Sequence, residues 1–170
     1  MEVYFEGVLI RPWSLNDSDF LAAIANIKHI ADNLRDGFPF PYSITDAYSW
    51  LNSIIPINTP ARFFAIIFND QIVGRIRNVT KEDIYRKNLE LGYFIAEEVW
   101  GKGIFTKAIK AVTSYAFNNF DIARVYAEPF ADNKGSRRAL EKAGFVCEAV
   151  LVKNVIKNGV LKDSCIYSIL

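Results

Sequence analysis

The spacing of apolar positions changes several times along this chain, and each change predicts a different structural element. Seven segments are dense in branched, aromatic or alternating apolar residues, which is typical of β-strands. These segments are residues 8–13, 61–69, 72–77, 89–95, 122–130, 150–156 and 161–169. Two turn sequences, Asn69-Asp70-Gln71 and Lys157-Asn158-Gly159, each predict a β-hairpin formed by the two strands that flank the turn.

Between these strands, apolar residues recur three and four positions apart, as they do on one face of a helix. The helical segments are residues 20–31, 43–55, 104–117 and 133–143. Ser14 to Asp17 offers caps for the first helix, and Gly144 stands where a left-handed residue would end the last one. The order of elements predicts a single α/β or α+β domain over residues 1–170, built on a mixed sheet.

The composition fits a folded domain and argues against several classes of partner. Hydrophobic residues make up 51% of the 170, which is enough for a full core. The net charge of +1 gives no electrostatic reason to expect nucleic acid or a membrane surface as a partner. No run of about 18 apolar residues occurs, and the first residues lack the basic-then-apolar pattern of a signal peptide. A cytoplasmic protein is therefore expected.

Histidine and cysteine are scarce. His29 is the single histidine, and Cys147 and Cys165 are the two cysteines. One histidine does not assemble a zinc site or a Ser-His-Asp triad in the usual way, so no metal is expected, and His29 itself is interpreted as structural or solvated. Both cysteines lie in apolar, strand-like segments, which predicts buried free thiols rather than a disulfide scaffold.

The strand at residues 89–95 leads through a glycine turn, Trp100–Thr106, into the helix at 104–117. Glycine lets another group approach the backbone closely, and the first amides of a helix are unpaired at the positive end of its dipole. The pattern predicts an anion site suited to phosphate, with an ordinary turn as the alternative. A dinucleotide fingerprint would need glycine at Thr106, and the Gly-Lys-Ser/Thr of a P-loop is absent, so neither is favoured.

Several short motifs support a more specific interpretation of this turn. They are Leu9–Trp13, Glu90–Phe94, Trp100–Thr106, Asn133–Ser136, Ala139–Phe145, and Lys157–Gly159 followed by Asp163. In order and spacing these motifs resemble the GNAT superfamily of N-acetyltransferases, and within it the ribosomal-protein alanine acetyltransferase-like (RimJ/RimL-type) branch. The turn resembles the acetyl-CoA pyrophosphate loop of that family, Gln/Arg-x-x-Gly-x-Gly/Ala, with Gly103 as the central glycine. Trp100 and Phe105 depart from its first and last positions.

The resemblance implies a fold and an activity. The fold would be a central mixed, mostly antiparallel twisted sheet of six to seven strands, flanked by about four helices and splayed at the cofactor site. The activity would be direct transfer of an acetyl group from acetyl-CoA to a primary amine, on a protein N-terminus or a small molecule, in a ternary complex. A non-catalytic acyl-CoA-binding or sensing domain is the alternative, because Leu140 stands where many family members carry a tyrosine. The expected assembly is a monomer or a homodimer.

The resemblance also implies which residues bind the two substrates. Acetyl-CoA would contact the end of the strand, the turn and the start of the last helix. These residues are Phe94, Ile95, Trp100, Gly101, Lys102, Gly103, Ile104, Phe105, Thr106, Asn133 and Ser136. Phe38, Phe40 and Tyr42, from a proline-containing aromatic loop, would line the acceptor pocket.

The chemical roles fall on a few polar residues. Glu128 is the first candidate for the general base, with Glu97 and Glu90 behind it. The alternative for each is a carboxylate that is solvated or paired with an arginine. Ser136 would protonate the leaving thiolate, or would instead cap the last helix together with Asn133.

Overall fold

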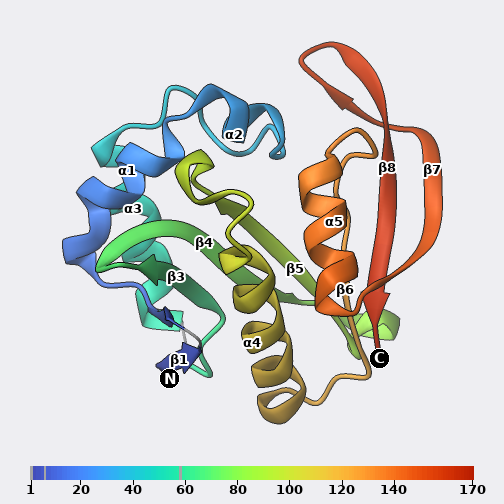
Figure 1. Ribbon diagram of the computed structural model, residues 1–170, viewed down its shortest axis with the longest axis horizontal. Helices are drawn as coiled ribbons and strands as arrows, with labels where there is room; N and C mark the ends of the chain where they lie inside the picture. Colours follow the sequence, from blue (N-terminus) through green and yellow to red (C-terminus); the bar gives the residue numbers. More distant parts are fainter. Residues whose placement is uncertain (1, 6, 58) are drawn as a thin grey trace.

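A single eight-stranded sheet organises the computed structural model (Figure 1), which describes residues 2–5, 7–57 and 59–170. The strands are β1 (Val3–Phe5), β2 (Val8–Pro12), β3 (Phe63–Phe68), β4 (Gln71–Thr80), β5 (Asn88–Ile95), β6 (Arg124–Ala127), β7 (Val146–Lys157) and β8 (Val160–Ile169). Their order is β1-β2-β3-β4-β5-β6-β8-β7, and among the described residues only β5 and β6 pair in parallel. The mixed, mostly antiparallel sheet is confirmed. It has eight strands rather than six to seven because β1 adds a short edge strand to β2.

The described part of the chain forms five α-helices beside the sheet, rather than about four. They are α1 (Ser18–Ala25), α2 (Lys28–Asp32), α3 (Ile44–Ile54), α4 (Ile104–Asn119) and α5 (Lys134–Ala143). The helix expected over residues 20–31 is divided at Asn26, whose side-chain oxygen accepts a hydrogen bond from the backbone N–H of Tyr42 at 3.0 Å. Within the described ranges, no helix combines the length and apolar character needed to cross a bilayer.

The turn residues adopt the backbone conformations that the sequence predicts. Asn69 and Asp70 both have positive φ (50° and 60°), as do Asn158 and Gly159 (51° and 77°), which is the geometry of two-residue hairpin turns. Gly144 ends α5 in the left-handed conformation, with φ of 100°. The Phe145 N–H returns to the Leu140 carbonyl at 3.0 Å, as in a Schellman motif.

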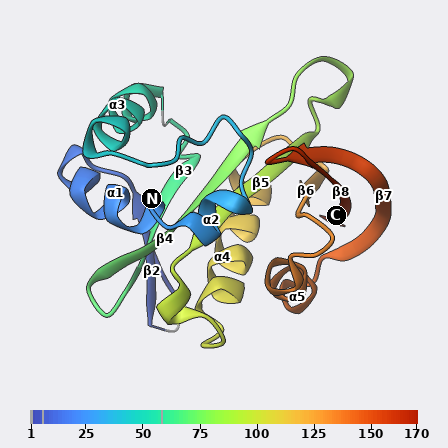
Figure 2. The ribbon, with the colours of Figure 1, turned by 90° about the horizontal axis from the view of Figure 1, so that it is seen from above.

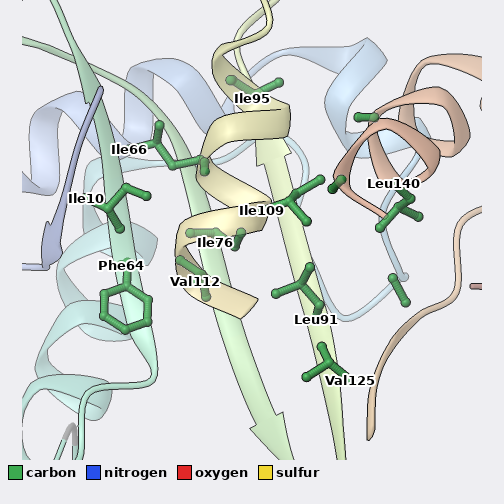
Figure 3. Packing of buried hydrophobic residues seen from close by; sticks show 14 of the residues in the cluster. Ile10, Phe64, Ile66, Ile76, Leu91, Ile95, Ile109, Val112, Val125 and Leu140 are labelled. Atoms are coloured by element: carbon green, nitrogen blue, oxygen red, sulfur yellow. The ribbon is translucent and has the colours of Figure 1, made fainter. Parts of the chain in front are cut away.

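Two layers of helices cover opposite faces of the sheet, as Figure 2 shows for α1 and α3 on one side and α4 and α5 on the other. Successive residues of β3 divide accordingly. Phe64 and Ile66 belong to the cluster that contains α4, whereas Ala65 belongs to the cluster formed with α1 and α3. Figure 3 shows the first cluster, in which Ile109 and Val112 of α4 are fully buried against the strands. The sheet is therefore packed on both faces.

The two cysteines differ in environment. Cys165, in the interior strand β8, is buried as predicted. Cys147 is exposed, so the prediction of a second buried thiol was wrong. The reason is that β7 is the edge strand of the sheet, and its first three residues, Val146 to Glu148, are all exposed.

The sheet opens between its two parallel strands. β5 and β6 pair only from Asn88 to Glu90 on one side and from Arg124 to Tyr126 on the other. β5 then continues to Ile95 along β4, whereas β6 ends at Ala127, shortly before Pro129. The edge of β5 that faces away from β4 is therefore without a strand partner from Leu91 to Ile95.

Candidate active site

A cavity of about 1170 Å³ adjoins the unpaired edge of β5. One part of its lining comes from the loop before α4 and the starts of α4 and α5: Val99, Trp100, Gly101, Gly103, Phe105, Thr106, Asn133, Lys134, Gly135 and Ser136. Another part comes from α2, the aromatic loop, α3 and β4, including Phe38, Tyr42, Trp50, Arg75 and Arg77. The cavity therefore joins the predicted cofactor residues to the predicted acceptor wall.

The start of α4 presents unpaired backbone amides. Gly101 and Gly103 both have φ of 75°, a conformation that glycine adopts without strain, and a Cβ at either would meet no atom within 4 Å. No side chain caps the helix, and its first backbone hydrogen bond at this end runs from the Lys107 N–H to the Gly103 carbonyl. Among the described residues, the amides from Gly101 to Thr106 are thus open, at the positive end of a 16-residue helix, whereas the Trp100 N–H already donates to the Glu97 carbonyl. They fit the pyrophosphate of a coenzyme A.

The other side chains of this loop contribute differently. Lys102 is exposed and outside the cavity lining, and Ile104 is buried in the core, so neither side chain faces the cavity and each could contribute only its backbone. The Phe105 ring packs edge-on against Tyr93, with centroids 4.6 Å apart. This contact explains how an aromatic residue is accommodated where the family pattern has a small one.

Trp100 ties the loop to the preceding strand and to α2. Its indole N–H donates to the Ile95 carbonyl at 3.2 Å, and its ring lies edge-on to His29, with centroids 5.3 Å apart. His29 Nδ1 in turn lies 2.9 Å from Glu97 Oε1. The lone histidine, distant in sequence, therefore lies at this end of the cavity. The sequence carried no signal for that contact.

The start of α5 separates the roles of Asn133 and Ser136. The Asn133 side chain caps the helix by accepting a hydrogen bond from the Ser136 backbone N–H at 3.0 Å. The Ser136 hydroxyl takes no part in that cap and lies 2.7 Å from the Tyr93 hydroxyl. Burial raises the pKa of the Tyr93 phenol, which keeps it protonated. Sequence reasoning missed Tyr93, although it falls within the Glu90–Phe94 motif.

Glu90 is held in ion pairs. Its carboxylate accepts hydrogen bonds from Arg35 at 2.5 Å and from Lys81 at 2.6 Å. Burial by itself raises the pKa of Glu90. The Lys81 hydrogen bond and the nearby positive charges outweigh burial, so the pKa lies below the ordinary glutamate value. A carboxylate stabilised in this way is a weak proton acceptor. Glu90 therefore matches the alternative given for each candidate base, a carboxylate paired with an arginine.

The other two candidate bases occupy different surroundings. Glu128 lines the cavity just beyond β6, and its Oε1 accepts hydrogen bonds from Ser164 Oγ at 2.8 Å and Asn154 Nδ2 at 2.9 Å. Both donors are neutral, so they hold the carboxylate without adding positive charge. Glu97 pairs with His29 and lies outside the cavity lining.

The predicted acceptor wall is aromatic, and one of its three expected residues lies outside it. Phe38 stacks on Tyr42, with centroids 4.8 Å apart, and meets Phe94 edge-on at 5.7 Å. Phe40 is half-exposed and does not line the cavity, so it does not belong to this wall. Leu140, at the position of the family tyrosine, is fully buried.

The tip of the terminal hairpin lies beside α2 and the loop that follows it, as Figure 2 shows. Lys157 donates to Asp36 at 2.9 Å, and the Asn158 side chain donates to Asp32 at 3.0 Å. Within the described ranges, no three His, Cys, Asp or Glu side chains gather as a metal site would require.

A mixed sheet splayed between parallel strands, with an open helix start beside the gap, defines a protein built to hold a phosphate-bearing cofactor along a strand edge. A protein-family model described as an acetyltransferase (GNAT) domain matches residues 8–146. This chain therefore belongs to the GNAT acetyltransferase family.

Individual relatives agree with this assignment. A probable N-acetyltransferase of Bacillus subtilis, YjcK, is 39% identical over 105 residues, which are 60% of this chain and 56% of that protein. The chain thus spans about half the length of such curated relatives. The solved microcin C7 self-immunity acetyltransferase in complex with acetyl-CoA and AMP is 26% identical, with a TM-score of 0.83 over 98% of this chain and 93% of that one. A ribosomal L7/L12 alpha-N-protein acetyltransferase in complex with coenzyme A shares the fold at 17% identity, with a TM-score of 0.88 over 100% and 98%.

Proposed function

We propose that this protein transfers an acetyl group from acetyl-CoA to a primary amine. The proposal depends mainly on one observation: the uncapped start of α4 and the unpaired edge of β5 both line the same cavity. The first suits the pyrophosphate of acetyl-CoA, and the second offers backbone groups to its extended arm. Family membership supports the same chemistry.

The reaction needs a group that accepts the proton of the amine. We assign this role to Glu128, because its carboxylate lines the cavity and is held only by neutral donors. Glu90 is already neutralised by two cations, and Glu97 lies outside the cavity lining. In this mechanism the amine nitrogen attacks the thioester carbon as its proton passes to Glu128, directly or through water.

The reaction also generates two centres of negative charge. The carbonyl oxygen would be stabilised by a backbone N–H of the unpaired β5 edge. The departing thiolate would accept a hydrogen bond from the Ser136 hydroxyl, which Tyr93 holds in place. The products are then the acetylated amine, coenzyme A as its thiolate, and protonated Glu128.

Two measurements test the proposal. Titration calorimetry should detect acetyl-CoA binding, and a thiol-release assay over a panel of amines should detect turnover. Binding without turnover on any amine would favour the alternative, a non-catalytic acyl-CoA-binding domain, which Leu140 motivates. Absence of binding at millimolar acetyl-CoA would overturn both. A cytoplasmic location and a monomeric or homodimeric state stay predictions.

A further inference from the structure

Arg75 of β4 is a buried cation without a counter-ion. Its side chain lines the cavity, yet the residue is only 7% exposed. Among the described residues no carboxylate forms an ion pair with it, and its Nε has no hydrogen-bond partner. Because an isolated buried charge is costly, this arrangement requires an explanation.

Three aromatic rings surround the guanidinium. Its central carbon lies 4.6 Å from the Trp50 ring centroid, 5.1 Å from that of Phe94 and 5.4 Å from that of Phe38. Their π-faces compensate part of the lost hydration, but they do not replace a counter-charge. Burial accordingly lowers the pKa of Arg75 to about 9, and the nearby Arg77 charge contributes in the same direction.

Arg75 lies on the acceptor side of the site. Its cross-strand partner Ala65 belongs to the cluster covered by α1 and α3, whereas its neighbour Ile76 packs on the α4 side. The phosphate site at the start of α4 is therefore on the other face of the sheet. Arg77, two residues along the strand, also lines the cavity, and its pKa is lowered by burial as well.

We propose that the amine acceptor of this enzyme carries a carboxylate, which binds the Arg75 guanidinium. The inference rests on the proposed acetyl transfer. A planar guanidinium suits a carboxylate because it donates two parallel hydrogen bonds, and the ring stack on Trp50 fixes its orientation. An acidic acceptor would supply the missing counter-charge. A polyamine would instead add positive charge beside Arg75 and Arg77.

The test compares ω-aminocarboxylates of five and six carbons with their carboxamides, whose amines have similar basicity at that chain length, and with spermidine. Wild-type enzyme should prefer the carboxylates by about 10- to 100-fold in kcat/KM, since a hydrogen bond to a charged group is lost in the amides. Arg75→Met should abolish this preference through a higher KM for the carboxylates. The readout is the ratio of kcat/KM between each carboxylate and its carboxamide in the same variant, which should fall to about 1, so that a general loss of activity does not count as support. Arg75→Lys, which keeps the charge, should recover part of the preference.

A binding measurement separates this inference from the proposed function. Calorimetry with N-acetylated ω-aminocarboxylates, in the presence of coenzyme A, needs no turnover. Suppose that the protein acetylates no amine but binds these compounds, and that Arg75→Met abolishes the binding. This result would support the carboxylate site and overturn the proposed acetyltransferase activity. Equal turnover of carboxylates, carboxamides and spermidine by the wild type would overturn the carboxylate site. So would an equal loss of both substrate types in Arg75→Lys. If Arg75→Met does not fold, the wild-type panel and Arg75→Lys still decide.

Discussion

The two sides of the cavity differ in whether backbone or side-chain groups line them. The cofactor side consists mainly of backbone: open amides at the start of α4, left-handed glycines and an unpaired strand edge. The acceptor side consists of side chains, namely a stacked aromatic wall around a buried guanidinium. A backbone site tolerates changes of side chain, which is why Trp100 and Phe105 can depart from the family pattern. A side-chain site changes its ligand with each substitution.

The largest effect should come from the side chain proposed to take the proton. Glu128→Gln keeps the shape and the Ser164 hydrogen bond but removes the base, so kcat should fall about 10²-fold or more. The matched control is Glu97→Gln, which lies outside the cavity lining and should leave kcat within about twofold. Steady-state thiol release measures both. The opposite ranking would transfer the role to Glu97.

The next effect tests whether backbone, rather than charge, holds the pyrophosphate. Gly103→Val forces a β-branched residue into φ of 75°, at a cost of about 1–3 kcal/mol or a displaced helix start. The KM for acetyl-CoA should rise about 10-fold or more. The neighbouring Lys102→Ala should change KM less than about twofold, because its side chain is exposed. A larger effect in Lys102→Ala would mean that a cation, and not the amides, is the main contact.

A substitution at Ser136 tests whether a side chain also contributes on the cofactor side of the cavity. Ser136→Ala removes the hydroxyl that contacts Tyr93 but keeps the N–H that Asn133 caps. One lost hydrogen bond to the thiolate should lower kcat about 10-fold, and the melting temperature should also fall, because the buried Tyr93 hydroxyl loses its partner. Tyr93→Phe, which only removes the support of that hydroxyl, should cost less. A lower melting temperature with normal kcat would show that the hydroxyl is structural.

The smallest effect concerns Glu90, expected to stabilise rather than to catalyse. Its pKa is lowered in the folded state, so its contribution is present above the ordinary glutamate pKa and is lost as pH falls through the lowered value. Glu90→Gln should therefore cost about 1 kcal/mol near pH 7, since Arg35 remains largely solvated. The difference in unfolding free energy between wild type and Glu90→Gln should become smaller below about pH 4. Urea unfolding across this range measures it, and a gap independent of pH would contradict the ion-pair account.

Local chemistry explains which features could be predicted from sequence. The hairpin turns, the Gly144 helix end and the left-handed glycines of the turn before α4 each depend on a few consecutive residues, and they were found. Phosphate binding at that turn stays a prediction. Contacts between distant segments were not. The Asn26 break depends on a bond to Tyr42, and the environment of Arg75 depends on rings from three separate elements. The sequence ranked Glu128 ahead of Glu97 as the candidate base, but it could not show that Glu128 lines the cavity whereas Glu97 lies outside the lining.

The contacts of the terminal hairpin with α2 and the loop after it have a consequence for the order of folding. Lys157 and Asn158 contact residues 121 and 126 positions earlier in the chain. Closing such long loops is entropically unfavourable until the intervening sheet has formed. The aromatic side of the cavity is therefore expected to form late. The cofactor side should form earlier, because its turn and helix are adjacent in sequence. A nascent or partly folded chain would then recognise acetyl-CoA before it can recognise an acceptor.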